Sequence, residues 1–231
     1  MADFLMSLPL FCLLLTVGAF QIGLWCQKKT GSILCNPILI GAALVGTVLI
    51  LLDIDMTAYQ SSTSGISWLL TPATVCFAVP LYRQMKVLKK NMPAVITGVT
   101  TGTIVSLGSI FLLCLVWKLD RQLSVSLLPK SITTAMGMVL AEQNGGIPAL
   151  SSVAILITGI LGNLAGPFLC KCLKLADPIS QGVAYGTASH IIGTSKAAQI
   201  HPLAGAVSSL SLVVAGILTA LVFPFLCTFI G

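Results

Sequence analysis

Long apolar runs separated by short polar turns dominate the chain, and none of them alternates with the period of two typical of a half-buried strand. Lipid offers no partners to backbone N–H and C=O groups, so apolar runs of about 20 residues predict membrane-spanning helices. We predict six full spans, at Pro9–Cys26, Ile33–Leu52, Ile66–Tyr82, Pro93–Trp117, Pro148–Leu169 and Leu203–Phe229. The first run lacks the basic residues of a signal peptide, so we interpret it as a span.

Two further apolar segments are short and interrupted by polar residues. They run from Pro129 to Gly146 and from Pro178 to Pro202. We therefore predict an all-α membrane protein, a polytopic helical bundle with about six full spans and two interrupted, re-entrant helical segments. The whole chain, residues 1–231, is expected to form a single transmembrane domain.

Basic residues follow the first, third and fifth predicted spans: Lys28, Lys29, Arg83, Lys86, Lys89, Lys90, Lys171 and Lys174. Loops rich in Lys and Arg stay on the cytoplasmic side. All three loops share that side if both interrupted segments re-enter, which predicts both termini outside. If only one segment crosses, the topology of the C-terminal part is reversed.

Composition supports the membrane class and excludes others. The chain is 56% hydrophobic and 8% charged, whereas about 25% of the residues in a soluble domain are charged. The net charge of +6 is not arranged as a basic stripe with aromatic residues, so no nucleic-acid partner is expected. The eight cysteines are scattered without a CxxC pair, and we interpret them as small apolar side chains. No metal site or cofactor is predicted.

An internal similarity links two of the predicted spans. Ser151–Cys170 aligns with Ser208–Cys227 without a gap, at an offset of 57 residues. A repeated unit would consist of one interrupted segment followed by one long span. Repeats built on broken helices are typical of transporters, with the binding site where the breaks meet. The alternative is chance similarity between helices rich in Leu and Gly.

The first candidate binding segment is Pro129–Thr134. Proline suits the first position of a helix, and Ser and Thr can satisfy free amides there. A helix that begins inside the membrane would direct its positive dipole end, beside Lys130, toward an anion. The alternative is that Lys130 extends to the lipid headgroups. The candidate residues of this segment are Lys130, Ser131, Thr133 and Thr134.

The second candidate segment is YGTASHIIGTSK, residues 185–196. On a helix, Thr187, His190 and Thr194 form one stripe that offers hydroxyls and an imidazole. An adjacent stripe, formed by Gly186, Ser189, Gly193 and Lys196, is small enough for close packing. Together they could bind the carboxylate and hydroxyl of a small hydroxy or keto acid. The alternative is a polar contact between helices, with His190 bonded to a carbonyl. The candidate residues are Thr187, Ser189, His190, Thr194 and Lys196.

Enzyme classes find little support in the chain. Ser189 and His190 are sequence neighbours and would not face each other on a helix. Nucleophile-elbow, HExxH and phosphate-loop motifs are missing from the sequence. We therefore predict no catalytic residue and no enzymatic activity.

Four segments resemble the LrgB/CidB family in order and spacing: LLTPATVCFAVPLY (69–82), LLPKSITTAM (127–136), GGIPALSSVAILITGILGNLAGP (145–167) and GVAYGTASHIIGTSKA (182–197). The resemblance extends from about Asn36 to the C-terminus. The chain departs from the family pattern at Ala135, where a proline is usual, at Lys196, where the family has Arg, and at Ala204, where an acidic residue is frequent. These departures put the substrate in doubt but not the fold.

The resemblance implies a multi-pass protein of the bacterial inner membrane. Bacterial members are named as holin-like or antiholin-like modulators of murein hydrolase activity and autolysis, acting with a small LrgA/CidA-type membrane protein. A plastid relative exchanges glycolate and glycerate, and some bacterial pairs are linked to pyruvate uptake. Besides the lipid bilayer, the expected partners are a small organic anion, an LrgA/CidA-type protein and further copies of the chain in a homo-oligomer.

Three functional hypotheses follow. The first is a secondary transporter of small monocarboxylates such as pyruvate, glycolate and glycerate, because the two polar segments suit an anion. The second is an antiholin-like modulator of murein hydrolase export and autolysis. The third is a passive pore.

Overall fold

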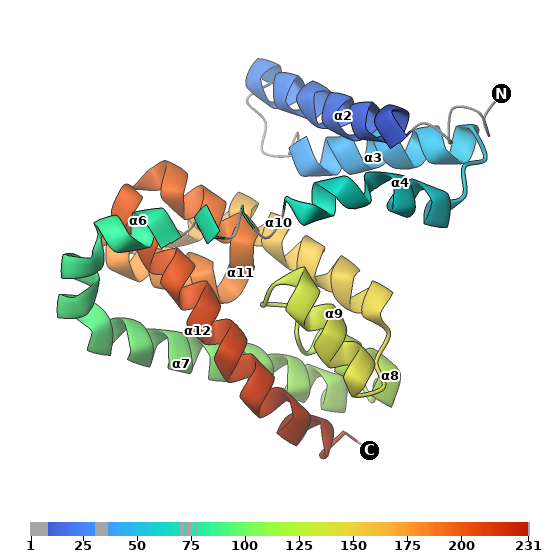
Figure 1. Cartoon of the computed structure of the whole chain (residues 1–231). Helices are drawn as coiled ribbons and strands as arrows, with labels where there is room; N and C mark the ends of the chain where they lie inside the picture. Colours follow the sequence, from blue (N-terminus) through green and yellow to red (C-terminus); the bar gives the residue numbers. More distant parts are fainter. Residues whose placement is uncertain (1–8, 31–36, 70–71, 73–74, 77, 231) are drawn as a thin grey trace. The chain divides into compact units, whose positions relative to one another are not determined.

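The structure, a computed structural model, describes residues 9–30, 37–69, 72, 75–76 and 78–230 (Figure 1). Every regular element in these ranges is a helix, which confirms the all-α prediction. The chain forms two compact units, Met1–Cys76 and Phe77–Gly231. Within these described ranges, four helices are long and apolar enough to cross a membrane. They are α2 (Pro9–Thr30), α7 (Met85–Val116), α10 (Pro148–Cys172) and α12 (Pro202–Cys227).

The N-terminal unit contains α2, α3 (Pro37–Leu51) and α4 (Met56–Trp68). Small residues allow α2 and α3 to pack closely, since a Cβ on Gly41 would touch the backbone of Phe20. The Thr16 and Tyr59 hydroxyls are hydrogen-bonded at 2.6 Å and join α2 to α4. This polar contact between helices is of the kind that supports association in lipid.

Two predicted spans differ from the helices of the structure. The predicted span Ile33–Leu52 lies partly outside the described residues. Its described helix, α3, has 15 residues, about 22 Å of helix, which is shorter than the roughly 30 Å hydrocarbon core. The predicted span Ile66–Tyr82 lies partly outside the described residues, with α4 ending at Trp68 and α6 (Ala78–Arg83) following. The number of six full spans therefore stays a prediction.

The predicted basic loop before the fourth span is helical instead. We expected that span to begin at Pro93, but α7 begins at Met85 and contains Lys86, Lys89 and Lys90. Met, Lys and Leu are good helix formers, and these residue types extend the helix from Met85 to the proline. The lysines thus lie on the first turns of a 32-residue helix.

Helix α11 (Pro178–Ile200) breaks at its centre, which agrees with the predicted interruption of this segment. Ser189 and His190 leave helical geometry, with φ/ψ of −132°/15° and 42°/−137°. The expected helical stripe through Thr187, His190 and Thr194 is therefore wrong, because the helix does not continue across residues 185–196. Gly182, before the break, and Ala198, after it, both lie against the first turn of α12. The element is therefore a hairpin whose two ends lie at the same end of α12 (Figure 1).

The predicted segment 129–146 belongs to a second hairpin, formed by α8 (Arg121–Leu127) and α9 (Thr134–Gln143). Our expectation that its helix begins at Pro129 is wrong. The Leu128 amide still bonds to the Ser124 carbonyl, so Pro129 follows the last turn of α8, and proline cannot continue a helix there. A turn leads from it to Thr133, the N-cap of α9.

The two hairpins lie at opposite ends of α12. Arg121, at the start of α8, donates from Nη1 to the carbonyls of Cys227, at 3.2 Å, and Ile230. Leu140, near the end of α9, packs in the same cluster as Cys227. The α11 hairpin lies at the other end, where its Ile179 packs against the start of α7 and of α12. The tips of both hairpins therefore point toward the middle of α12.

The helix bounds agree with the internal repeat. The offset of 57 residues carries the start of α8 at Arg121 to the start of α11 at Pro178, and the end of α9 at Gln143 to the end of α11 at Ile200. Asp120 and Asp177, the N-caps of α8 and α11, are equivalent, and each accepts a backbone N–H. Each unit thus consists of a hairpin followed by a long helix, α10 or α12.

Candidate functional site

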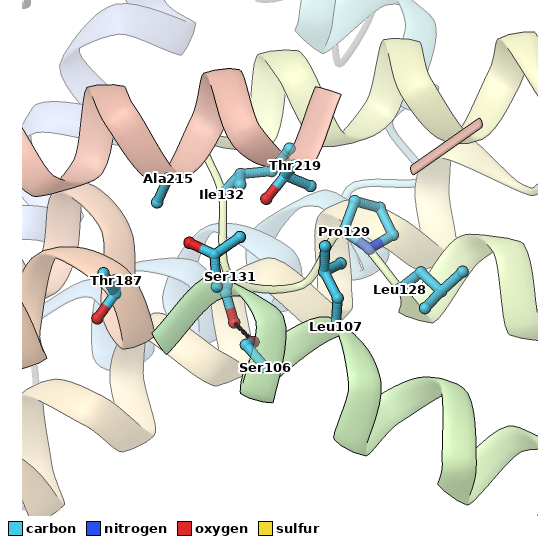
Figure 2. Close-up of a pocket in the computed structure, with 10 residues that line it drawn as sticks. Ser106, Leu107, Leu128, Pro129, Ser131, Ile132, Thr187, Ala215 and Thr219 are labelled. Carbon is cyan, nitrogen blue, oxygen red and sulfur yellow. Dashed lines mark hydrogen bonds between the residues drawn. The ribbon is translucent and has the colours of Figure 1, made fainter. Parts of the chain in front are cut away.

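A small cavity lies where the hairpin tips approach α7 and α12 (Figure 2). The turn between α8 and α9, Leu128–Ile132, forms one wall, and Thr187 of α11 lies close to the break of the other hairpin. The lining residues are Thr103, Ser106, Leu107, Leu128, Pro129, Ser131, Ile132, Thr187, Ala215 and Thr219. The space open to the centre of a water molecule is about 10 Å³, roughly what one buried water needs.

Five hydroxyl-bearing residues line this cavity, and one hydroxyl stands out. Thr103 is 5% exposed, and its Oγ1 has no hydrogen-bond partner in the described part of the chain. Buried hydroxyls almost always have a partner, and an exception indicates a water, an ion or a ligand. By contrast, the Thr187 hydroxyl donates to the Val183 carbonyl at 2.7 Å. The Thr103 group can therefore contact an occupant without breaking another bond.

Lys130 brings positive charge to the tip of the first hairpin. Its Nζ, half-buried, donates to Ser131 Oγ at 3.1 Å, its one hydrogen bond within the described ranges. Ser131 Oγ is also hydrogen-bonded to Ser106 Oγ at 2.8 Å. If Ser131 accepts from the ammonium, it can donate to Ser106, whose own proton stays available. This chain of contacts connects the charge of Lys130 to the hydroxyl-lined cavity.

The start of α9 adds a second favourable feature for an anion. Thr133, the N-cap, makes no side-chain hydrogen bond to the first turn. Unpaired amides and the helix dipole give a helix N-terminus a partial positive charge. Thr133 and Thr134 are half-buried and do not line the cavity. They would act through the backbone of this turn.

The remaining predicted residues lie around the break of α11 and not in the cavity lining. His190 Nε2 donates to the Ile155 carbonyl of α10 at 2.8 Å, because a carbonyl can only accept. Thr194 Oγ1 donates to the His190 carbonyl at 2.9 Å and lies 2.8 Å from Ser208 Oγ. Ser189 is buried in the contact with α10, and Lys196 is half-buried. In the structure His190 and Thr194 thus hold the hairpin in place.

Glycines of α10 allow the broken segment to approach. A Cβ on Gly159 would lie 2.6 Å from the His190 ring, and one on Gly162 would lie 1.7 Å from Ser189 Oγ. His190 takes a backbone conformation used almost only by glycine, which costs about 1–3 kcal/mol. Close packing against Gly159 and Gly162 of α10 and the hydrogen bond to the Ile155 carbonyl stabilise this backbone conformation of His190.

Sequence reasoning missed three lining residues with hydroxyls, namely Thr103, Ser106 and Thr219. Thr103 and Ser106 are three residues apart on α7, so they share one stripe of that helix. A pair of hydroxyls on one stripe of an apolar span was the available signal. The face of α7 that meets the hairpin tip is set by packing alone.

These features define a helical membrane protein with two opposed, discontinuous hairpins that meet at a polar cavity. The sequence profile of the LrgB-like family matches residues 16–229. The chain is 32% identical to the protein YwbG of Bacillus subtilis over 97% of its own length and 100% of the relative. It is 29% identical to the holin-like protein CidB of Staphylococcus epidermidis over 93% of each chain. It is also 30% identical to the antiholin-like protein LrgB of Bacillus cereus, over 96% of this chain and 97% of the relative.

The chain therefore belongs to the LrgB-like family. No solved structure matches it.

Proposed function

We propose that this chain is a holin-like or antiholin-like protein that modulates murein hydrolase activity and autolysis. The observation that supports this proposal is the match to CidB and LrgB relatives over more than nine-tenths of both chains. The protein would be a multi-pass component of the bacterial inner membrane. It would act with a small LrgA/CidA-type membrane protein.

The charges of the C-terminal unit support one orientation. Lys86, Lys89 and Lys90 lie at the start of α7, the end where α11 begins and where Lys171 and Lys174 also lie. By the positive-inside rule this end would be cytoplasmic. The α8–α9 hairpin would then enter from the outside, and α12 would end there.

The test is expression in a bacterium that lacks its own LrgB-family gene, with and without an LrgA/CidA-type partner. We expect a changed rate of detergent-induced autolysis and a changed extracellular murein hydrolase pattern on zymograms. The comparison variant is Arg121→Glu, in which the contacts between the start of α8 and the C-terminal end of α12 should be weakened. Wild-type protein that inserts normally but changes neither readout, with or without the partner, would overturn the proposal.

A second candidate function is transport of small monocarboxylates, and the cavity favours it. Hydroxyl donors, an ammonium and a helix start converge where two hairpins from opposite ends meet. No carboxylate lines the described part of this cavity, so a ligand would supply the negative charge. A passive pore does not need such an enclosed polar site.

The opposed hairpins also suggest how a carrier would work. The cavity now has space for about one water, so a monocarboxylate requires one hairpin tip to withdraw. Withdrawal of the α11 tip would open the cavity to one end of α12, and withdrawal of the α8–α9 tip would open it to the other. This is alternating access around a fixed site.

Proteoliposomes test the transport candidate. Uptake of labelled pyruvate, glycolate or glycerate should saturate with concentration, and Lys130→Gln should reduce it at least tenfold. Lys118→Gln, in the turn after α7, is the control that removes the same charge elsewhere. Equal uptake by the Lys130 and Lys118 variants would refute the site, and leakage of unrelated solutes of similar size would favour the pore.

A further inference from the structure

Two further cavities lie between α10 and α11, away from the hydroxyl-lined cavity. The first is a crevice of about 170 Å³, and the second, with a volume of about 460 Å³, lies at the turn between the two helices. Both are lined by Cys170 and Leu175, so they adjoin. Together they form one groove that runs from the end of the helices toward their middle.

The crevice is almost entirely apolar. Its wall on α10 includes Gly162 and Gly166, and the Tyr185 ring of α11 lies against Gly166. The other lining residues are Leu169, Cys170, Leu173, Leu175, Ala184, Ala188 and Ser189. An apolar groove on a helix pair in a membrane suits a hydrocarbon chain.

The outer cavity is cationic. Lys171 and Lys174 line it, and both are exposed. The only acidic residue of this turn, Asp177, is engaged as the N-cap of α11, where it accepts from the Ser180 amide at 2.9 Å. Gln181 Nε2 donates to the Leu175 carbonyl at 2.7 Å and fixes the turn. The mouth of the groove therefore carries two ammonium groups, those of Lys171 and Lys174, on a turn fixed by hydrogen bonds.

The position along the helices fits a lipid headgroup. The turn lies at the same end as the lysines of α7, the end assigned to the cytoplasm. The cytoplasmic leaflet carries anionic lipids, and basic pockets between helices on that side bind their headgroups. A packed helix of a second chain would leave the two lysines without partners, whereas an anionic lipid satisfies both parts of the groove.

We propose that this groove binds one anionic phospholipid, with its phosphate between Lys171 and Lys174 and one acyl chain in the crevice. The groove shares no lining residue with the central cavity, and the choice of an anionic headgroup rests on the cytoplasmic orientation proposed above for this end. It would anchor the base of the α11 hairpin to the membrane surface.

Native mass spectrometry of the purified full chain tests this proposal with added phosphatidylglycerol and phosphatidylcholine. We expect phosphatidylglycerol to bind at least tenfold more tightly, since each lysine near a headgroup favours it. The double variant Lys171→Gln, Lys174→Gln should lose that preference and retain phosphatidylcholine binding. The control variant Lys89→Gln, Lys90→Gln removes two charges at the same end and should keep the preference.

A second variant tests the crevice. Ala188→Phe would fill it and should reduce retention of both lipids at least fivefold, whereas Ile157→Phe, on the exposed face of α10, should not. Equal loss of phosphatidylglycerol in the two lysine variants would overturn the headgroup assignment. Unchanged retention in Ala188→Phe, or a second copy bound to the crevice in place of lipid, would overturn the site.

Discussion

The substitution Thr103→Val tests whether the Thr103 hydroxyl binds a ligand or stabilises the folded protein. Valine has nearly the shape of threonine, so the change replaces the hydroxyl with a methyl group. Thr103 Oγ1 is buried and has no partner in the described ranges, and an unsatisfied buried polar group costs about 1–3 kcal/mol. We therefore expect the free energy of unfolding to stay unchanged or to rise by about 1 kcal/mol. A bound water at Thr103 would account for the lower limit.

The corresponding rise in melting temperature is about 2–4 °C for a chain of this size. Binding should move in the opposite direction. A hydrogen bond to a charged ligand contributes about 1.5–3 kcal/mol, so apparent affinity for a small monocarboxylate should fall by about tenfold or more. Thermal unfolding in detergent measures the first quantity, and concentration-dependent uptake in proteoliposomes measures the second.

Thr100→Val is the matched control on the same helix. The Thr100 hydroxyl donates to the Ile96 carbonyl at 2.8 Å and does not line the cavity. It should leave uptake unchanged. If Thr103→Val instead lowers the melting temperature by several degrees and leaves uptake intact, the hydroxyl has a structural partner and the reasoning fails.

Three further predictions concern the supports of the hairpins. Gly162→Ala places a Cβ 1.7 Å from Ser189 Oγ and should lower the free energy of unfolding by about 1–3 kcal/mol, whereas Gly108→Ala, with open space around it, should be neutral in the same thermal assay. Arg121→Gln removes the hydrogen bonds to the carbonyls of Cys227, the last residue of α12, and of Ile230 beyond it, and should speed hydrogen exchange at this end of α12, with the start of α12 unchanged. The hydrogen bond from the Ser180 amide lowers the pKa of the Asp177 carboxyl. The stabilisation that the ionised carboxylate gives to the folded state is therefore complete above the ordinary pKa of aspartate, and it is lost as the pH falls through the lowered pKa. Asp177→Ala should cost about 1 kcal/mol near neutral pH and less in acid, and an equal cost at both pH values would contradict the capping role.

Several features of the fold follow from local sequence. Runs of apolar residues require helices in lipid, whatever their neighbours. Asp-Pro at 177–178 and Pro148 mark helix starts because of their fixed φ and capping chemistry. The interrupted segments were recognisable from their polar residues, and the offset of 57 residues agrees with the helix bounds.

Which residues line the cavity depends on tertiary packing and could not be predicted from the sequence. Helical periodicity shows that Thr103 and Ser106 share a stripe, but it does not show which helix that stripe faces. Ser131 and Thr187 line one space because the hairpins enter from opposite ends of α12. For His190 the sequence left open a ligand group or a hydrogen bond to a neighbouring carbonyl, and the structure has the second, to the Ile155 carbonyl of α10.

The sequence by itself therefore determined the helical class, the two interrupted segments and the family. The tertiary structure decided where Pro129 ends one helix and which hydroxyls share a cavity. The physical reason is that backbone hydrogen bonding in lipid is a local requirement, whereas contact between side chains depends on how separate helices rotate and cross. Those angles are set by close approaches such as Gly162 on Ser189, which no single segment reveals.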